Sequence, residues 1–332
     1  MNIWKNLCTL LRHPKRSLKQ AVKGELLDEF LLRDKAAWEQ AGYLHPQREG
    51  SMRGMMIFLA HCIEKGLTMP RFEPGHGRNR IQDLCRVVIK YRESGYDRNA
   101  FEYRVALSVL AEYQHVHEEL EYALPEDLSR AIQDALAGES ASQGKQIDMT
   151  PKKLWQHANS AFPAFSASRH SVRNFASDAP RADILAAINL ATNAPCACNK
   201  QYVRVHMYEG ADKVRPLLAL QNGNTGFGDM SGQLLIVTAD MNYMHWRGER
   251  HEIYLCAGLF AMNLGYALHY HHVAHCMLNW QVPPHTDRQM RELAGIPENE
   301  EIALLIICGL PPAEFKATAS PRHSGGDITI IH

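Results

Sequence analysis

The stretch from Ile253 to Leu278, "IYLCAGLFAMNLGYALHYHHVAHCML", most constrains what this chain can fold into, because it contains no Asp, Glu, Lys or Arg. Its purely apolar part ends near Leu268, and four histidines follow before Leu278. A helix that spans a bilayer needs roughly 20 apolar residues, so this part is too short to be one. We therefore predict a buried helix over residues 253–268, central to its domain.

Small residues recur along this predicted helix. Gly258, Ala261 and Gly265 stand at positions i, i+3 and i+7, which places them on one side. Such a stripe lets another helix approach closely, either within the domain or at a subunit interface.

Composition and charge limit the classes of protein to consider. The 332 residues are 45% hydrophobic and 22% charged, which is typical of a soluble globular protein with room for two domains. The 36 Lys and Arg balance 36 Asp and Glu, so no overall positive field attracts nucleic acid, and we predict no nucleic-acid partner. The scattered cysteines form no disulfide framework, which favours a reducing, cytoplasmic setting. They stand at positions 8, 62, 85, 196, 198, 256, 276 and 308.

Residues 1–23, "MNIWKNLCTLLRHPKRSLKQAVK", carry basic but no acidic side chains, and the first acidic residue is Glu25. Charges interrupt the apolar residues too often for a secretory signal. Two interpretations stay open: peripheral contact with an anionic membrane through residues 1–23, or a helix that packs on its own domain and is broken by Pro14.

The chain divides near residues 136–151, "LAGESASQGKQIDMTP", where polar residues and Gly interrupt the apolar periodicity. Residues 1–145 predict a mainly helical N-terminal region. After the division, in residues 152–332, helical and strand patterns alternate, which predicts an α+β domain. We expect helices in "KKLWQHA", capped by Thr150 and Pro151, and in "RADILAAINLAT", and strands in "YVRVHMY", "QLLIVTA", "HCMLNW" and "EIALLIICGL".

Two arginines bracket a serine in "RHSVRNF", residues 169–175. If this segment is extended, Arg169, Ser171 and Arg173 project to the same side. Two guanidinium groups and a hydroxyl are a donor set that suits a phosphate. The alternative is a solvated basic stretch after a helix.

Several short motifs occur together in one order: "SRHSVRNF", "APCACNKQY", "YLCAGLFAMNLGYAL", "GIPENEEIALLIICGLP" and "PRHSGGDITIIH". In this order they resemble the nitroreductase family of flavin oxidoreductases over about residues 152–332. The resemblance implies a nitroreductase-like mixed sheet flanked by helices, bound FMN, NAD(P)H as reductant, and an intertwined homodimer with FMN at the subunit interface. The upstream "HCIEKGLTMPRFEPGHGRNRIQDL" also resembles a subgroup associated with surface-polysaccharide biosynthesis.

The resemblance assigns roles to individual residues. Arg169, Ser171 and Arg173 would bind the FMN phosphate together with Arg322, although Ser320 stands where the family often has a second basic residue. The remaining FMN-binding candidates are Pro195, Cys196, Asn199 and Gln201 near the flavin ring, and Leu278 and Asn279 beside its N5 region.

Two departures from the family pattern stand near these candidates. Cys196 replaces the family's serine, and the glycine usual near Leu278 and Asn279 is missing. Cys196 and Cys198 are either a redox-active pair or two thiols in a loop. We favour the loop, because a disulfide between them would close a strained ring.

The histidine-rich end of the apolar stretch invites a metal interpretation. His271 and His275 would share a helical face at i, i+4, but no HExxH glutamate lies between them, so we predict no metal site. "GFGDMSG" at residues 226–232 is read as a loop, because it precedes a strand instead of opening a helix.

Together these patterns predict an FMN-dependent NAD(P)H oxidoreductase that passes hydride through flavin N5 to an unknown small-molecule acceptor by ping-pong kinetics. We predict no catalytic side chain. We also expect the tail after Pro311 to cross to the partner, with "ITIIH" as an edge strand and Arg322 at the flavin phosphate. Two alternatives stay open: a dehydrogenation or reductive step on a sugar-linked intermediate, and an FMN-binding or flavin-free interaction module of a membrane-associated polysaccharide assembly.

Overall fold

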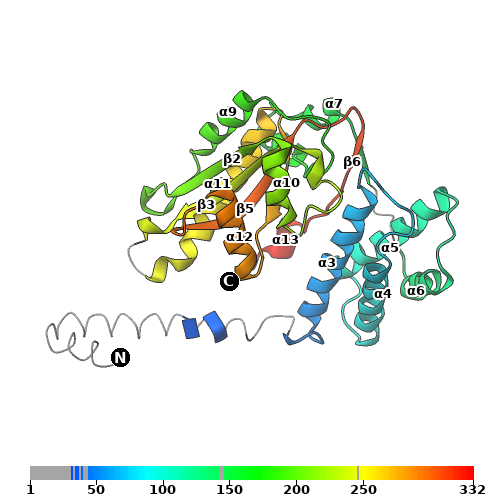
Figure 1. Cartoon of the computed structure of the whole chain (residues 1–332). Helices are drawn as coiled ribbons and strands as arrows, with labels where there is room; N and C mark the ends of the chain where they lie inside the picture. The colour runs from blue at the N-terminus through cyan, green and yellow to red at the C-terminus, as the bar shows by residue number, and fades with distance from the viewer. Residues whose placement is uncertain (1–30, 33, 37–38, 40–43, 142–145, 245–246) are drawn as a thin grey trace.

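The computed structural model describes residues 31–32, 34–36, 39, 44–141, 146–244 and 247–332. Its chain forms a helical part followed by a part in which helices cover a sheet (Figure 1). Residues 1–23, for which we expect either membrane contact or helical packing, lie outside the described residues. None of the described helices combines the length and the apolar character that crossing a membrane requires.

Four helices build the helical part: α3 (Glu49–Leu67), α4 (Arg78–Glu93), α5 (Phe101–Glu119) and α6 (Glu126–Leu136). Each contributes fully buried side chains to one shared core, in which the rings of Tyr91 and Tyr103 stack 5.3 Å apart. Apolar residues at helical spacing form this core. None of its described buried residues belongs to the sheet.

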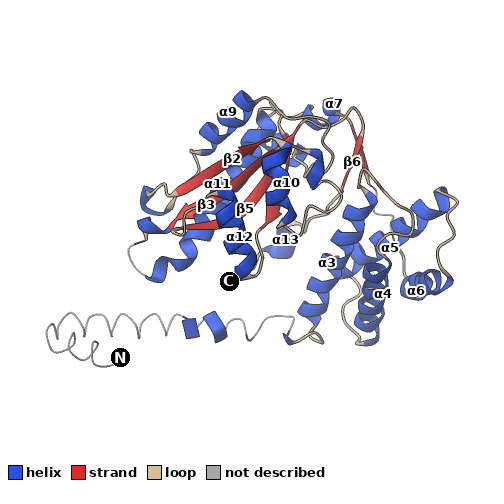
Figure 2. Ribbon diagram, in the orientation of Figure 1, coloured by secondary structure: helices blue, strands red, loops and turns tan. Residues whose placement is uncertain are grey.

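The main sheet has four strands in the order β2-β3-β5-β4, and each neighbouring pair is antiparallel (Figure 2). Their bounds are β2 Val203–Glu209, β3 Gln233–Asp240, β4 Ala274–Asn279 and β5 Glu300–Gly309. Consequently β2 and β4 form opposite edges of the sheet. The four predicted strands are all present, and the predicted α+β class is confirmed.

Helices cover both faces of this sheet, which explains why the central strand β3 is almost continuously apolar. Leu234 and Ile236 pack on one face, in the core that includes side chains of α10 and α12, whereas Leu235 and Val237 pack against α9 and α11 on the other. The covering helices are α9 Arg181–Ala191, α10 Ala211–Ala219, α11 Glu252–Tyr270 and α12 Pro284–Ala294.

Smaller elements connect the two parts. Strand β1 (Ile147–Met149) pairs antiparallel with β6 (Phe315–Ala317). As predicted, Thr150 caps the following helix α7 (Pro151–Trp155), and its hydroxyl accepts a hydrogen bond from the Lys153 backbone N–H at 3.2 Å. The helix is shorter than predicted and ends at Trp155. Helix α8 is Phe162–Ser168 and helix α13 is Gly325–Ile328.

Helix α11 is buried along one side only. A Cβ added at Gly265 would lie 2.5 Å from the Met277 Cε atom, whereas one at Gly258 would meet nothing within 4 Å. Within one chain the predicted burial of this helix is therefore met on the side toward the sheet, and an interface on the other side stays a prediction. Helix α11 exposes five large apolar residues: Tyr254, Leu255, Leu259, Met262 and Tyr270.

The C-terminal "ITIIH" forms no strand within the described chain, and its expected pairing with a partner's sheet stays a prediction. Ile328 ends the short helix α13, and residues 329–332 pair with no described strand. Ile328, Ile330 and Ile331 are 71%, 80% and 90% exposed, because nothing in the described chain covers them.

We predict that Gly309→Ala lowers the free energy of unfolding by about 1–3 kcal/mol, the usual cost of overpacking. A Cβ at this position of β5 would lie 2.9 Å from both the Ser177 backbone oxygen and Phe175 Cδ1. Because the Leu310 N–H donates to that oxygen at 2.8 Å, the clash would break a backbone bridge. Urea denaturation measures the change.

Gly54→Ala is the matched control, because a Cβ at this position of α3 meets nothing within 4 Å. It should raise stability by up to about 1 kcal/mol through helix propensity. Equal effects of the two substitutions would contradict the close contact at Gly309.

Candidate anion-binding site beside strand β4

Residues 169–177 form an extended segment, here called the strap, that lies along the sheet. The strap follows α8, and Arg169 leaves the helix with φ −73° and ψ 118°. The Val172 N–H donates to the His275 carbonyl at 2.9 Å, and the Ala176 N–H donates to the Leu310 carbonyl at 2.9 Å. These bonds fix the strap beside the start of β4 and the end of β5.

The strap has the extended conformation on which the predicted phosphate site depends. Val172 is buried in the core shared with Leu278 and Ile307, whereas its neighbours Ser171 and Arg173 are partly exposed. This alternation is the period of two expected of an extended chain. A solvated basic stretch would not bury a side chain such as Val172. That alternative therefore does not describe these residues.

Arg173 reaches a small cavity of about 140 Å³ at the side of β4. Its guanidinium donates to the Thr318 hydroxyl at 3.4 Å. Leu278 and Asn279, both predicted site residues, line the same cavity. Lys65 lines it from α3, and its ammonium donates to the Gly223 carbonyl at 3.1 Å. The structure thus brings three predicted residues and one unpredicted cation together.

Arg322 approaches the strap within the same chain. Its guanidinium donates to the Ser320 carbonyl at 2.5 Å, and the Ser320 hydroxyl in turn donates to Thr318 at 2.9 Å. Burial lowers the pKa of Arg169, and the positive charge of Arg322 lowers it further. Arg322 therefore lies close enough to act on Arg169 without crossing to a partner.

Among the described residues these cations form no ion pair, although the Glu64 carboxylate lies close by and accepts a hydrogen bond from the Ser320 N–H at 2.7 Å. Among the described residues, no carboxylate oxygen lies within 4.0 Å of Lys65, Arg169, Arg173 or Arg322 in an ion pair. Burial is the main cause that lowers the pKa of Lys65, and the charge of Arg173 adds to it. Partly buried charges without counterions are costly, so a bound anion would relieve this cluster.

Two buried histidines lie behind the strap. His269 contacts the Ser168 hydroxyl through Nε2 at 2.8 Å, and burial lowers the pKa of His269 to about 4. His275 is buried in β4, where burial lowers its pKa to about 3, and its Nε2 atom has no hydrogen-bond partner. Both imidazoles are therefore neutral at pH 7.

The helical spacing considered for metal binding is not realised. Helix α11 ends at Tyr270, so His271 follows the helix while His275 lies in β4. In the part of the chain that the structure describes, no three His, Cys, Asp or Glu side chains gather as a metal site.

The predicted contacts to the flavin ring form a second group, away from Arg173. Pro195, Cys196, Asn199 and Gln201 lie in the loop between α9 and β2, and the Gln201 amide donates to Asn199 Oδ1 at 2.9 Å. Cys196 packs in a small apolar cluster around Tyr202, and both Cys196 and Cys198 are free thiols.

This loop lies at the edge of the sheet opposite to β4. Strands β2 and β4 are separated by three strand spacings, or about 14 Å. One chain therefore does not bring Asn199 and Gln201 to the cavity at Arg173. Asn199 and Gln201 also have positive φ angles of 52° and 51°, which non-glycine residues rarely adopt.

Sequence reasoning missed Lys65. The residue stands in "HCIEKGL", inside a helix more than a hundred residues before the strap. Helical periodicity shows only that such a residue lies on a helix surface. Its proximity to Arg173 depends on how α3 packs against the sheet, which no local pattern predicts.

No protein-family model and no curated protein matches this chain. Among solved structures, it is similar to a putative NADH oxidase from Clostridium acetobutylicum, with 17% identity over 50% of this chain and 98% of the other, at a TM-score of 0.44. A putative NAD(P)H:FMN oxidoreductase from Staphylococcus epidermidis has 16% identity over 52% of this chain and 96% of the other, at a TM-score of 0.46. A nitroreductase family protein from Streptococcus pneumoniae has 19% identity over 52% of this chain and 100% of the other, at a TM-score of 0.43. Similarity of this degree does not assign a function, which must therefore rest on the residues of the site.

We predict that the protein loses stability as the pH falls from about 6.5 to about 4. An unfolded histidine binds its proton near pH 6.5, whereas folded His269 binds it only near pH 4. Between these values the unfolded state holds more protons, so acid favours unfolding, by up to about 3 kcal/mol for this residue. Urea denaturation at a series of pH values measures the slope.

His269→Gln should reduce this slope without abolishing it, because glutamine does not titrate whereas buried His275 still contributes. His115→Gln is the control, since that histidine is exposed on α5 and should leave the slope unchanged. A slope that is identical in all three proteins would contradict the assignment to His269.

Proposed function

We propose that this chain is an FMN-dependent oxidoreductase that takes hydride from NAD(P)H and delivers it to a small-molecule acceptor. The observation that carries the proposal is the group of cations at the strap and α3, which has no carboxylate partner among the described residues and lies beside the end of β4. A phosphate monoester such as that of FMN matches its charge and its donors.

The donors fit a phosphate in number and kind. Arg169 and Arg173 offer planar guanidinium groups, and Ser171 offers a hydroxyl from between them. Lys65 and Arg322 would add positive charge from the two other segments that approach the strap. With the phosphate held there, Leu278 and Asn279 at the end of β4 are placed to contact the flavin ring.

FMN bound there would supply hydride transfer at its N5 atom, in a ping-pong cycle with NAD(P)H and the acceptor. The protein's part is to bind and orient. The strap would hold the phosphate, and the buried residues of β4 would keep water from one side of the ring. We assign no general acid or base to a side chain. A role in polysaccharide biosynthesis rests on the upstream sequence resemblance alone and stays a prediction.

We further propose a homodimer that completes the site. The exposed apolar side of α11, Tyr254, Leu255, Leu259 and Met262, favours a partner that covers it. A two-fold partner packed there could place its own Asn199 and Gln201 near the flavin ring, which one chain cannot do. The partner could then also cover the exposed isoleucines of the C-terminal tail. This does not depend on whether Arg322 binds the phosphate of its own subunit or that of the partner.

We expect the purified protein to be yellow and to release FMN on denaturation. Arg173→Ala should weaken FMN binding by about 1.5–3 kcal/mol, the usual contribution of hydrogen bonds to a charged group. Quenching of flavin fluorescence on titration into apoprotein measures the affinity. Arg130→Ala is the control, because Arg130 lies on α6 and pairs with exposed Glu126.

A colourless protein that also fails to bind added FMN would disprove the proposed function. If the protein binds FMN but Arg173→Ala and Arg130→Ala behave alike, the phosphate lies elsewhere.

We expect Leu259→Glu to shift the protein toward monomer and to lower FMN retention. Leu259 is 43% exposed on α11, and a buried carboxylate at an apolar interface is costly. Light scattering after gel filtration measures the mass. Leu293→Glu on α12 is the control, since Leu293 is an exposed leucine outside the proposed interface. A wild-type monomer that retains FMN would contradict the dimer.

A further inference from the structure

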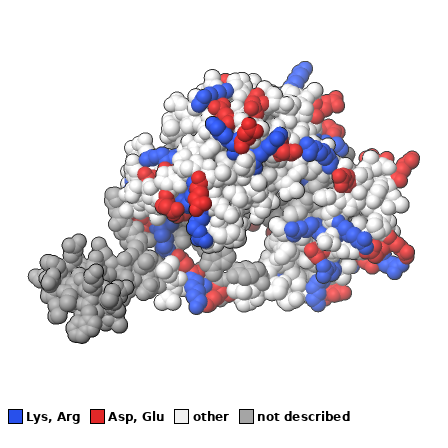
Figure 3. All heavy atoms as spheres, in the orientation of Figure 1, with Lys and Arg blue, Asp and Glu red and all other residues white. Residues whose placement is uncertain are grey.

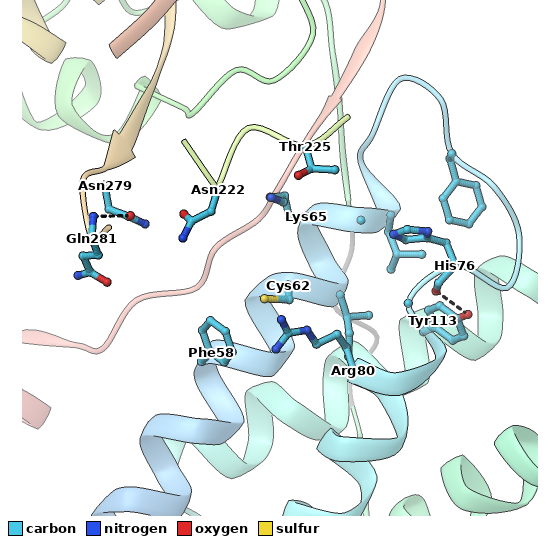
Figure 4. A pocket seen from close by; sticks show the side chains of 15 residues that line it. Phe58, Cys62, Lys65, His76, Arg80, Tyr113, Asn222, Thr225, Asn279 and Gln281 are labelled. Carbon is cyan, nitrogen blue, oxygen red and sulfur yellow. Dashed lines mark hydrogen bonds between the residues drawn. The ribbon is translucent and has the colours of Figure 1, made fainter. Parts of the chain in front are cut away.

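A second and larger cavity, of about 530 Å³, lies between the helical part and the sheet. Figure 4 shows Phe58, Cys62 and Lys65 on α3 toward the side where Asn222 and Asn279 lie. Cys62, Lys65 and Asn279 also line the small cavity at Arg173, so the two cavities are neighbours. Cavities of this size commonly hold small organic ligands.

The charges that line this cavity have one sign. Lys65 and Arg80 contribute to its wall, and no Asp or Glu does among the described residues. This contrasts with the outer surface, where charges of both signs are interspersed (Figure 3). An anion is the ligand that such a wall favours.

Arg80 differs from the other arginines of α4 that flank it. Arg78 pairs with Asp127 at 2.6 Å, and Arg86 pairs with Asp83. The guanidinium of Arg80 instead lies over the Phe58 ring, 5.3 Å from its centroid, and no described carboxylate lies within 4.0 Å of it in an ion pair. Its hydrogen-bond donors are therefore available to a ligand that enters the cavity.

The rest of the wall suits a flat organic body. Phe58, Phe72 and Tyr113 supply aromatic surface, and the Tyr113 hydroxyl is engaged with the His76 carbonyl at 3.1 Å. Amide side chains of Asn222 and Gln281 add donors and acceptors. Apolar walls with a few polar groups are typical of small-molecule sites.

We propose that this cavity binds the acceptor, and that the acceptor is a small aromatic or apolar molecule with an acidic group that Arg80 binds. The acceptor role rests on the proposed function, because it requires FMN at the neighbouring cavity. Lys65 and Asn279, which line both cavities, place the body of the acceptor next to the end of β4. The helical part of the chain thus supplies the specificity of the reaction.

Three nitroaromatic probes of similar size test the charge requirement: 4-nitrobenzoate, 4-nitrophenyl phosphate and the neutral 4-nitrobenzamide. Titration calorimetry on the purified full chain measures their binding. We expect the acids to bind at least about tenfold more tightly than the amide, and Arg80→Gln to remove this difference. Whichever of 4-nitrobenzoate and 4-nitrophenyl phosphate binds more tightly shows whether the site prefers a carboxylate or a phosphate.

Turnover with the same probes tests the acceptor role. NAD(P)H donates a hydride and solvent a proton, and the nitro group takes up both to give a nitroso group and water. We expect Arg80→Gln to raise KM for 4-nitrobenzoate about tenfold or more while KM for NAD(P)H and for 4-nitrobenzamide stays the same. Arg80→Lys should retain part of the preference for the acids.

Arg86→Gln is the matched control, because it removes the same charge from α4 outside this cavity. Equal affinity for the acids and the amide, equal effects of Arg80→Gln and Arg86→Gln, or a rise of KM for NAD(P)H alone would overturn the proposal. A protein without FMN that binds the acids through Arg80 would disprove the proposed function but support the anion site. If the protein binds FMN but Arg80→Gln alters neither the affinity nor KM for the acids, the proposed function would be supported and the anion site disproved.

Discussion

Positive charge that no ion pair among the described residues neutralises is the constraint on which the site depends. Arg169 and Arg173 lie on a strap that is held to the sheet by backbone hydrogen bonds, so their backbone positions are fixed relative to β4 and β5. Burial and mutual repulsion lower the pKa of Lys65 and of Arg169. An arrangement of this cost is stable only if other packing supports it, and it gains most when an anion binds.

The packing that supports the strap is the two-sided burial of the sheet. Because α9 and α11 cover one face and α10 and α12 contribute to the core on the other, the central strands are rigid. Gly309 lets the strap approach β5 closely, since a side chain there would meet the Ser177 oxygen. The position of the cations thus depends on apolar burial and on one missing Cβ.

The helical part and the sheet meet where the two cavities adjoin. Lys65 contributes to both from α3, and Asn279 contributes to both from the end of β4. A site that is divided between two cores can change one half without unfolding the other. This separation suits hydride transfer at the sheet combined with a substrate preference supplied by the helices, as we propose.

The sequence by itself determined the α+β class, the four strands and the donor pattern of Arg169, Ser171 and Arg173, because these follow from periodicities within one segment. Within the described chain one side of α11 is exposed and the tail pairs with no strand, because a local pattern does not show where a neighbour lies. Only the tertiary structure brought Lys65 to the strap, placed Arg322 near Arg169 within the same chain, and put Asn199 and Gln201 at the opposite sheet edge. Contacts between distant segments depend on strand order and helix packing, which local patterns do not encode.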